Sequence, residues 1–126
     1  MNSKQHGDQG LAAAIYTFTE LGYSVCLPLT ESQRFDLIVV QNNICFRVEV
    51  KHSKSLTTSG GYCVELRTKG GNKTGETTKR ISSKDSELVF IRTPYGNWIF
   101  PTSELDGRAT ITLQSESKPE FKSIIK

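Results

Sequence analysis

The clearest pattern in this chain is a pair of apolar, β-branched segments separated by two asparagines. Phe35–Gln41 and Ile44–Lys51 are rich in valine and isoleucine, as strands are. They are apolar almost throughout, which is typical of a sheet covered on both faces. Asn42 and Asn43 lie between them. Because asparagine tolerates the left-handed backbone that a two-residue hairpin turn requires, the pattern predicts a tight antiparallel hairpin.

A helical pattern precedes this hairpin. The apolar residues that recur at helical spacing are Leu11, Ala14, Ile15, Phe18 and Leu21. We expect a helix from Gln9 to Leu21, with Asp8 as its N-cap and Gly22 as its C′ residue. We expect residues 1–6 to be frayed. The alanines of this helix allow it to lie close against a sheet.

Shorter apolar segments predict the remaining strands. They are expected at Ser24–Leu27, Tyr62–Leu66, Glu87–Arg92, Trp98–Phe100 and Thr110–Leu113. Trp98 is expected in the core or at a subunit interface. With 126 residues the chain is large enough for one hydrophobic core and too small for two, so residues 1–126 should form a single domain. The expected fold class is α/β, with an N-terminal helix packed on a central mixed β-sheet.

The predicted hairpin brings three charged side chains together. If Gln41 faces Ile44 across the turn, Asp36 lies directly opposite Glu49. Side chains alternate between the two faces of a strand, so Lys51 shares the face of Glu49. Two carboxylates opposed across a ladder repel each other, and a divalent cation with oxygen ligands would offset the repulsion.

The same cluster has a simpler interpretation, in which Lys51, Arg34 or Arg47 neutralises the two acids through surface ion pairs. The metal-binding interpretation leads to chemistry. Mg²⁺ keeps several of its waters and binds through one or two carboxylates, which fits Asp36 and Glu49. A metal held in this way can activate water and neutralise developing negative charge.

These residues resemble the PD-(D/E)XK nuclease superfamily, whose signature is an Asp on one strand and Glu-X-Lys on the next. Here the matching residues are Asp36 and Glu49-Val50-Lys51. Residues 7–51 further resemble the group I intron-associated branch, the homing endonucleases of cyanobacteria and their phages. The shared features are a Gly-Asp before an alanine-rich helix and the Gly-Tyr-X-Val and Phe-Asp-Leu segments. The resemblance implies a restriction-endonuclease-like fold and Mg²⁺-dependent, site-specific cleavage of double-stranded DNA, with Mn²⁺ able to substitute.

The resemblance also implies roles for individual residues. Asp36 and Glu49 would bind the metal, with the backbone carbonyl of Val50 as a third ligand. Lys51 would hold the attacking water and stabilise the pentacoordinate phosphate, so that hydroxide generation falls mainly to the metal.

One position departs from the superfamily pattern. Many members carry a further acidic residue near the start of the helix, and this sequence has Leu11 there. Asp8 lies about one helical turn earlier and could take over the role of metal ligand, or it could serve only as the N-cap. The departure leaves the number of bound metals open.

A basic stretch, rich in glycine and threonine, occupies residues 67–84. It is expected to be flexible, either as a surface loop or as a basic arm that follows the phosphate backbone of DNA. The net charge of +3 agrees with a nucleic-acid partner. Gln33 and Arg34, before the first hairpin strand, could contact a phosphate or could be solvated loop residues. The full set of candidate DNA-binding residues is Gln33, Arg34, Lys54, Arg67, Lys69, Lys73, Lys79 and Arg80.

Three functional interpretations stay open on the sequence. The first is a homing endonuclease, and the second is a Holliday-junction resolvase or another structure-selective nuclease, which would use the same strands and metal. The third is a non-catalytic DNA-binding module on a nuclease fold, favoured only by Leu11. A chain this short offers little surface for a long target, so a homodimer or homotetramer is expected to read two half-sites.

Composition also indicates a cellular compartment. Cys26, Cys45 and Cys63 lie in apparent strands without metal-binding spacing, and they are expected to be reduced core cysteines. The sequence has no signal-peptide pattern and no apolar run near the roughly 18 residues of a membrane helix. We therefore expect a soluble protein in the cytoplasm of a bacterial or phage-infected bacterial cell, with no membrane partner.

Overall fold

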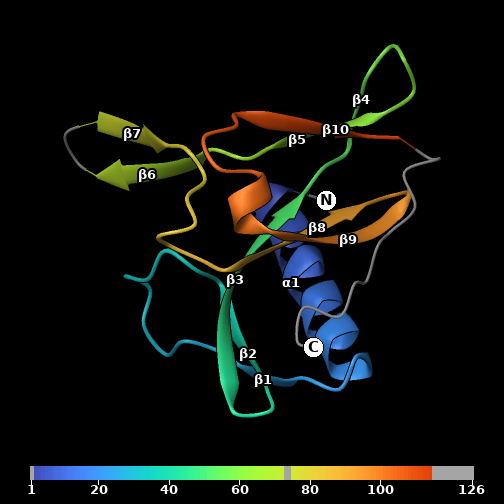
Figure 1. Cartoon of the computed structure of the whole chain (residues 1–126). Coiled ribbons are helices and arrows are strands. Elements are labelled where there is room, and N and C mark those ends of the chain that lie inside the picture. The colour runs from blue at the N-terminus through green and yellow to red at the C-terminus, as the bar shows by residue number, and fades with distance from the viewer. Residues whose placement is uncertain (1, 73–74, 115–126) are drawn as a thin grey trace.

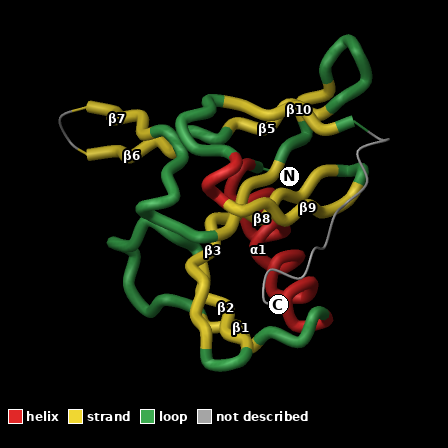
Figure 2. Tube along the Cα trace, in the orientation of Figure 1, coloured by secondary structure: helices red, strands yellow, loops and turns green. Residues whose placement is uncertain are grey.

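The computed structural model describes residues 2–72 and 75–114, and within these ranges it contains one long helix, ten strands and a short 3-10 helix (Figures 1 and 2). The strands form a five-stranded sheet in the order β1-β2-β3-β8-β9, a three-stranded sheet in the order β10-β5-β4, and the hairpin β6-β7. In chain order the elements are α1 (Ser3–Glu20), β1 (Ser24–Cys26), β2 (Leu37–Gln41), β3 (Ile44–His52), β4 (Ser55–Leu56), β5 (Tyr62–Glu65), β6 (Thr68–Asn72), β7 (Gly75–Lys79), β8 (Leu88–Thr93), β9 (Gly96–Pro101), η1 (Thr102–Glu104) and β10 (Thr110–Leu113).

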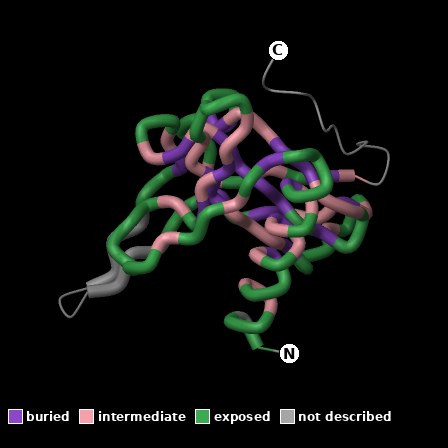
Figure 3. The backbone as a smooth tube through the Cα atoms, turned by 90° about the horizontal axis from the view of Figure 1, so that it is seen from below, coloured by how far each residue is buried: buried purple, intermediate pink, exposed green. Residues whose placement is uncertain are grey.

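The five-stranded sheet is mixed and has a core on each face. β3 and β8 run parallel, and the other neighbouring strands run antiparallel. α1 packs on one face, where Phe18 is buried with Leu37 and Phe90. The three-stranded sheet packs on the other face, where Val64 is buried with Ile91. Buried segments accordingly run through the middle of the molecule in Figure 3. The predicted α/β class, mixed sheet and packed N-terminal helix are confirmed.

The predicted hairpin is confirmed in its turn and in the pairing next to it. Gln41 pairs with Ile44, as expected. Asn42 and Asn43 have φ angles of 52° and 62°, in the left-handed region that the two-residue turn requires. Local turn chemistry therefore sets the register of β2 on β3.

The start of α1 differs from the prediction. The helix begins at Ser3, and its N-cap is Asn2 rather than Asp8. The Asn2 side chain accepts a hydrogen bond from the Gln5 N–H (2.9 Å), and the Gln5 side chain accepts one from the Asn2 N–H (2.8 Å). This capping box starts the helix two turns before its apolar stripe begins, so the expected fraying of residues 1–6 was also wrong for residues 3–6.

The end of α1 is as predicted. Gly22 has a φ angle of 89° directly after the C-cap residue Leu21. The Gly22 N–H donates to the Thr19 carbonyl, and the Tyr23 N–H donates to the Phe18 carbonyl (2.9 Å). These two bonds form a Schellman motif, which needs the left-handed conformation that glycine adopts without strain.

The described part of the basic stretch contains two paired strands where a flexible loop was predicted. β6 and β7 form an antiparallel hairpin in which Thr68 pairs with Lys79 and Asn72 pairs with Gly75. The hairpin extends away from the two larger sheets (Figure 1). Threonine favours extended backbone. The prediction of a loop gave more weight to the glycines and charged residues of this stretch.

The cysteines are free, as predicted, but they are not core residues. Cys26 and Cys45 are exposed, and Cys63 is half-buried. Val39 faces α1, so the neighbouring residues on the opposite face of β2 and β3 point away from the helix. That face is solvated near the turn, where Ile44 is 48% exposed. The expectation of a sheet covered on both faces therefore fails at this end.

The other predicted strands occur within one or two residues of the expected bounds. Trp98 is 3% exposed in the core beneath the three-stranded sheet, as expected of a core residue. β10 is an edge strand paired with β5. Within the part of the chain that the structure describes, no helix combines the length and the apolar character that a membrane crossing needs.

Replacing Phe18 with alanine is expected to lower the free energy of unfolding by about 3–5 kcal/mol. Phe18 is fully buried between α1 and the sheet, with its ring edge-on to Tyr23 (5.4 Å between centroids) and 6.0 Å from Phe90. Urea unfolding followed by circular dichroism measures the change. Tyr16→Ala on the same helix is the control, because Tyr16 is 67% exposed and its loss should cost less than about 1 kcal/mol. Equal losses for the two variants would contradict the assigned helix face.

An ion pair joins β3 to the residue that precedes β8. The carboxylate of Glu87 accepts hydrogen bonds from the Arg47 N–H (2.8 Å) and from the Arg47 guanidinium. The Arg47 guanidinium lowers the pKa of Glu87 below its ordinary value, while partial burial opposes this effect. A pKa that is lower in the folded state stabilises the fold above the unfolded pKa, and the stabilisation is lost as pH falls through the folded pKa.

Glu87→Gln should therefore lower the free energy of unfolding by about 1 kcal/mol at pH 7. This is less than for a buried charged hydrogen bond, because both side chains are more than a third exposed. The difference from the parent protein should narrow as pH falls below the ordinary carboxyl pKa of 4.5. Urea unfolding at pH 7 and pH 3 measures both differences. A gap that persists unchanged at pH 3 would mean that the charge of Glu87 is not what stabilises this joint.

Candidate active site

The predicted acidic cluster lies where β3 extends past the end of β2. The pairing of the two strands ends at Leu37 with Val48, while β3 continues to His52. β2 begins two residues later than predicted, and Asp36 lies just before it. The residues of β3 beyond Val48 have no backbone partner in β2, which leaves an open strand edge on this side.

The side chain of Asp36 takes the place of the missing strand. Its Oδ2 accepts a hydrogen bond from the Val50 N–H (2.7 Å), and its own N–H donates to the Val48 carbonyl (2.9 Å). The N–H and C=O of one strand residue point to the same side, so the Val50 carbonyl faces the same open edge. The described pairs do not include the predicted pairing of Asp36 with Glu49. Asp36 instead contacts the residues on either side of Glu49.

The surroundings of Asp36 raise the pKa of its carboxyl above the usual value. The residue is exposed as a whole, but the carboxylate lies against β3, and this local desolvation is the largest cause. The hydrogen bond from Val50 lowers the pKa, the charge of Glu49 raises it, and the charge of Lys51 lowers it. A carboxylate that is destabilised by a second carboxylate would be stabilised by a bound cation.

Glu49 and Lys51 share one face of β3, as predicted from strand alternation. The Lys51 Nζ lies 3.1 Å from the Glu49 Oε1, and both side chains are largely buried. The hydroxyl of Thr68, the first residue of β6, donates a hydrogen bond to the same Glu49 oxygen (2.8 Å). The root of the basic hairpin is thus joined to the candidate site, a contact that sequence reasoning missed.

Of the three basic residues in the simpler ion-pair interpretation, only one pairs with an acid of the cluster in the described residues. Lys51 does pair with Glu49. Arg47 binds Glu87 instead, and Arg34 forms no ion pair with the described residues. One ammonium therefore faces two carboxylates, and the local charge is not balanced by the protein's own basic groups.

A cavity of about 490 Å³ opens beside this edge of β3. Leu11 faces it from α1, at the position where an acidic residue was expected from the superfamily pattern. Asp8 is exposed and is not among the lining residues, so the structure does not support it as a substitute ligand. The lining residues are Gly7, Leu11, Asp36, Val50, Lys51, His52 and Glu65.

Glu65 at the end of β5 is a cavity residue that the sequence analysis missed. Hydrogen bonds from Arg67 lower the pKa of its carboxyl to about 2, and the charge of Lys51 also contributes. Glu65 is exposed at the end of β5. Nothing in the local pattern indicated that β5 crosses near β3.

The donor groups suit a hard cation. No set of three or more His, Cys, Asp or Glu side chains with metal-binding geometry occurs among residues 2–72 and 75–114. The available oxygens are the carboxylates of Asp36 and Glu49 and the carbonyl of Val50. Mg²⁺ accepts such a partial set because it keeps several waters, whereas a structural zinc site requires four nitrogen or sulfur ligands.

The candidate DNA-binding residues are spread around the site. Gln33 and Arg34 are exposed in the loop before β2, and the Gln33 amide donates to the Thr30 hydroxyl. The side chain of Lys69 and the whole of Lys73 lie outside the described residues. Three basic side chains at the hairpin base already have intramolecular partners. These partners are Glu65 for Arg67 (2.7 Å), Asp85 for Lys79 (2.8 Å) and the Gly107 carbonyl for Arg80 (2.6 Å).

Comparison with known proteins gives two matches that bear on this site. A family model described as PD-(D/E)XK endonuclease matches residues 1–122. The chain is also similar to the solved structure of a bacterial homing endonuclease, I-Ssp6803I, with a TM-score of 0.80 and 23% sequence identity over 98% of this chain and 86% of that chain. At this identity the second match shows the shared fold. No curated protein matches the chain.

Proposed function

The chain belongs to the PD-(D/E)XK endonuclease family and is therefore an endonuclease; within that family we propose that it is a Mg²⁺-dependent, site-specific enzyme of the homing type that cuts double-stranded DNA. The observation that carries the proposal is the cluster of Asp36, Glu49 and Lys51 beside a cavity at the open edge of β3. The homing character is supported by the resemblance of residues 7–51 and by the fold shared with a bacterial homing endonuclease.

Each residue of the cluster has a proposed task. Asp36 and Glu49 would hold Mg²⁺ together with the Val50 carbonyl, and the ion would supply an activated water and charge neutralisation. The Lys51 Nζ would donate hydrogen bonds to the attacking water and to a non-bridging phosphate oxygen. Leu11 would close the helix side of the cavity with an apolar wall instead of a further carboxylate.

The target is proposed to be read by more than one copy of the chain. A single small domain covers few base pairs, and symmetric oligomers present the same reading surface to two half-sites. We propose a homodimer or homotetramer. The hairpin β6-β7 and the loop with Gln33 and Arg34 would supply phosphate contacts near the scissile bond.

Plasmid cleavage tests this proposal. Supercoiled plasmids with and without an insert spanning an intron insertion site are incubated with the protein and Mg²⁺, and Mn²⁺ replaces Mg²⁺ in a second series. We expect a linear product only from the plasmid with the insert, and none when the metal is chelated. Cleavage of four-way junctions of any sequence would identify a structure-selective nuclease instead. Cleavage that persists with chelator would contradict the metal-dependent mechanism.

A further inference from the structure

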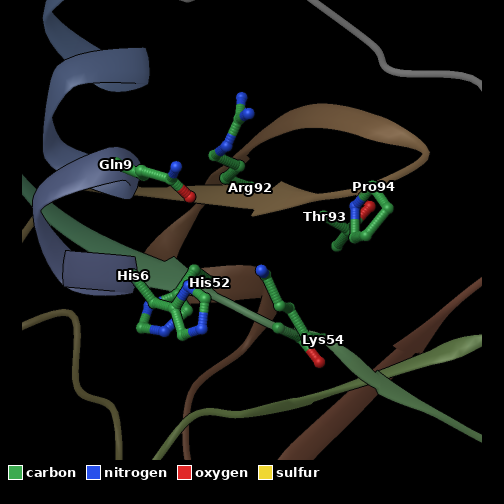
Figure 4. Close-up of a pocket in the computed structure, with 8 residues that line it drawn as sticks. His6, Gln9, His52, Lys54, Arg92, Thr93 and Pro94 are labelled. Atoms are coloured by element: carbon green, nitrogen blue, oxygen red, sulfur yellow. The ribbon is translucent and has the colours of Figure 1, made fainter. Parts of the chain in front are cut away.

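A second cavity, of about 200 Å³, lies on the α1 side of the sheet (Figure 4). α1 contributes His6 and Gln9, and the end of β3 and the following residues contribute His52 and Lys54. β8 contributes Arg92. Figure 4 shows the two imidazoles side by side and the Lys54 ammonium extending toward His52. The imidazole centroids are 5.9 Å apart.

The groups that line this cavity are basic or neutral, with no carboxylate among them. Neither Lys54 nor Arg92 forms an ion pair with any described residue, whereas Arg47, Arg67 and Lys79 all do. Two cationic side chains without an ion-pair partner among the described residues therefore line one small space, although the Arg92 guanidinium points away from the two imidazoles in Figure 4.

One hydrogen-bonding atom among the lining residues is also without a partner. The Nδ1 of His6 is buried and has no hydrogen-bond partner among the described residues. A buried polar atom left unpaired costs free energy. His6 lies near the N-terminus of α1, whose first turn carries no acidic residue, so the helix dipole adds positive potential at this end. The hydroxyls of Ser53 and Thr93, by contrast, already bond to the protein.

We propose that this cavity is a phosphate-binding site, and that in the DNA complex it holds a backbone phosphate near the one that is cleaved. The position follows from His52, which lines both this cavity and the one beside Lys51. A DNA strand carries one phosphate charge for every ~3.4 Å along its axis, so a strand at the active site presents further phosphates close by. The proposal that DNA supplies the bound phosphate rests on the proposed function. The proposal that the cavity binds phosphate does not.

A cation is the less favourable occupant. Two imidazoles can ligate a transition metal, but no third His, Cys, Asp or Glu with metal-binding geometry accompanies them among the described residues. Lys54 and Arg92 would repel a metal ion and attract a phosphate.

Imidazole NMR tests the anion site directly, because the chain contains only 2 histidines. Inorganic phosphate is titrated into the full-length protein at constant pH and ionic strength, with chloride as the balancing ion. Both imidazole signals should shift and saturate. Arg92→Ala and Lys54→Ala, both at exposed residues whose loss spares the core, should each weaken the apparent affinity about three- to tenfold. Lys84→Ala, at an exposed lysine outside the cavity, should leave it unchanged.

DNA binding measured in the absence of metal tests whether the cavity holds a DNA backbone phosphate or only free phosphate. Each of Arg92→Ala and Lys54→Ala should reduce the slope of log affinity against log salt by about one, and Lys84→Ala should not. If phosphate shifts the imidazole signals but the salt slope of DNA binding is unchanged in both variants, the cavity binds free phosphate and does not hold a DNA phosphate. Absence of shifts with phosphate, or shifts with Zn²⁺ alone, would overturn the site. A cleavage test that fails while both binding results hold would overturn the proposed function only.

Discussion

Lys51→Ala is expected to reduce DNA cleavage by about 10²–10³-fold while DNA binding stays within about threefold. The Lys51 Nζ is the proposed donor to the attacking water and to the phosphate, so its loss removes an interaction that strengthens in the transition state. In the proposed function, binding to the target would rest on many other phosphate contacts and should change little. Initial rates on a plasmid with the target site, together with gel-shift binding without metal, measure the two effects.

A matched variant separates catalysis from folding. Lys51 also pairs with the largely buried Glu49 at 3.1 Å, and an unpaired buried carboxylate is destabilising. Lys51→Arg keeps a positive charge beside Glu49, so its thermal unfolding should match that of the parent protein. Its cleavage should remain well below the parent rate, because the planar guanidinium cannot reproduce the position of the ammonium. Full cleavage by Lys51→Ala with Mg²⁺ would contradict the proposed role.

Asp36→Asn is expected to abolish divalent-metal binding at the site and to lower cleavage by at least about 10²-fold. The asparagine side chain can still accept the hydrogen bond from the Val50 N–H, so the open edge of β3 keeps its cap. What the substitution removes is the negative charge. Calorimetry with Mn²⁺, cleavage assays and thermal unfolding together measure the loss of affinity, the loss of activity and the expected retention of stability.

Asp36→Ala is the matched control, which distinguishes loss of the charge from loss of the hydrogen-bond acceptor. It removes both the charge and the acceptor of the Val50 N–H, and should cost about 1 kcal/mol of stability beyond Asp36→Asn. The two variants should be equally inactive. If Asp36→Asn still bound Mn²⁺ with parental affinity, the metal would have to be held without Asp36, and the proposed ligand set would be wrong.

The β2–β3 hairpin could be predicted because its determinants are adjacent in the chain. Asn42 and Asn43 supply the backbone angles of the turn, and strand alternation then places Glu49 and Lys51 on one face. The residue at which the pairing of β2 with β3 ends could not be predicted in the same way. Phe35 extends the apolar pattern beyond Asp36 toward the N-terminus, but β2 begins only at Leu37, after a polar loop.

Two elements were mispredicted for different physical reasons. The first turns of α1 are polar, so a search for an apolar stripe missed them, although the capping box of Asn2 and Gln5 is visible in the sequence. The hairpin β6-β7 has few apolar residues, and composition alone indicated a loop. Its base is held by a tertiary contact, the hydrogen bond from Thr68 to Glu49, which no local pattern contains.

Turn residues and a two-residue period were therefore sufficient to specify a hairpin that carries an acid on one strand and Glu-X-Lys on the next. Folding in three dimensions decided what surrounds them. Leu11 from α1, Glu65 from β5 and Thr68 from β6 reach the edge of β3 because helix and second sheet pack on opposite faces of the same strands. Such packing depends on burying apolar surface between segments far apart in the chain, and short-range patterns do not encode which segments will meet.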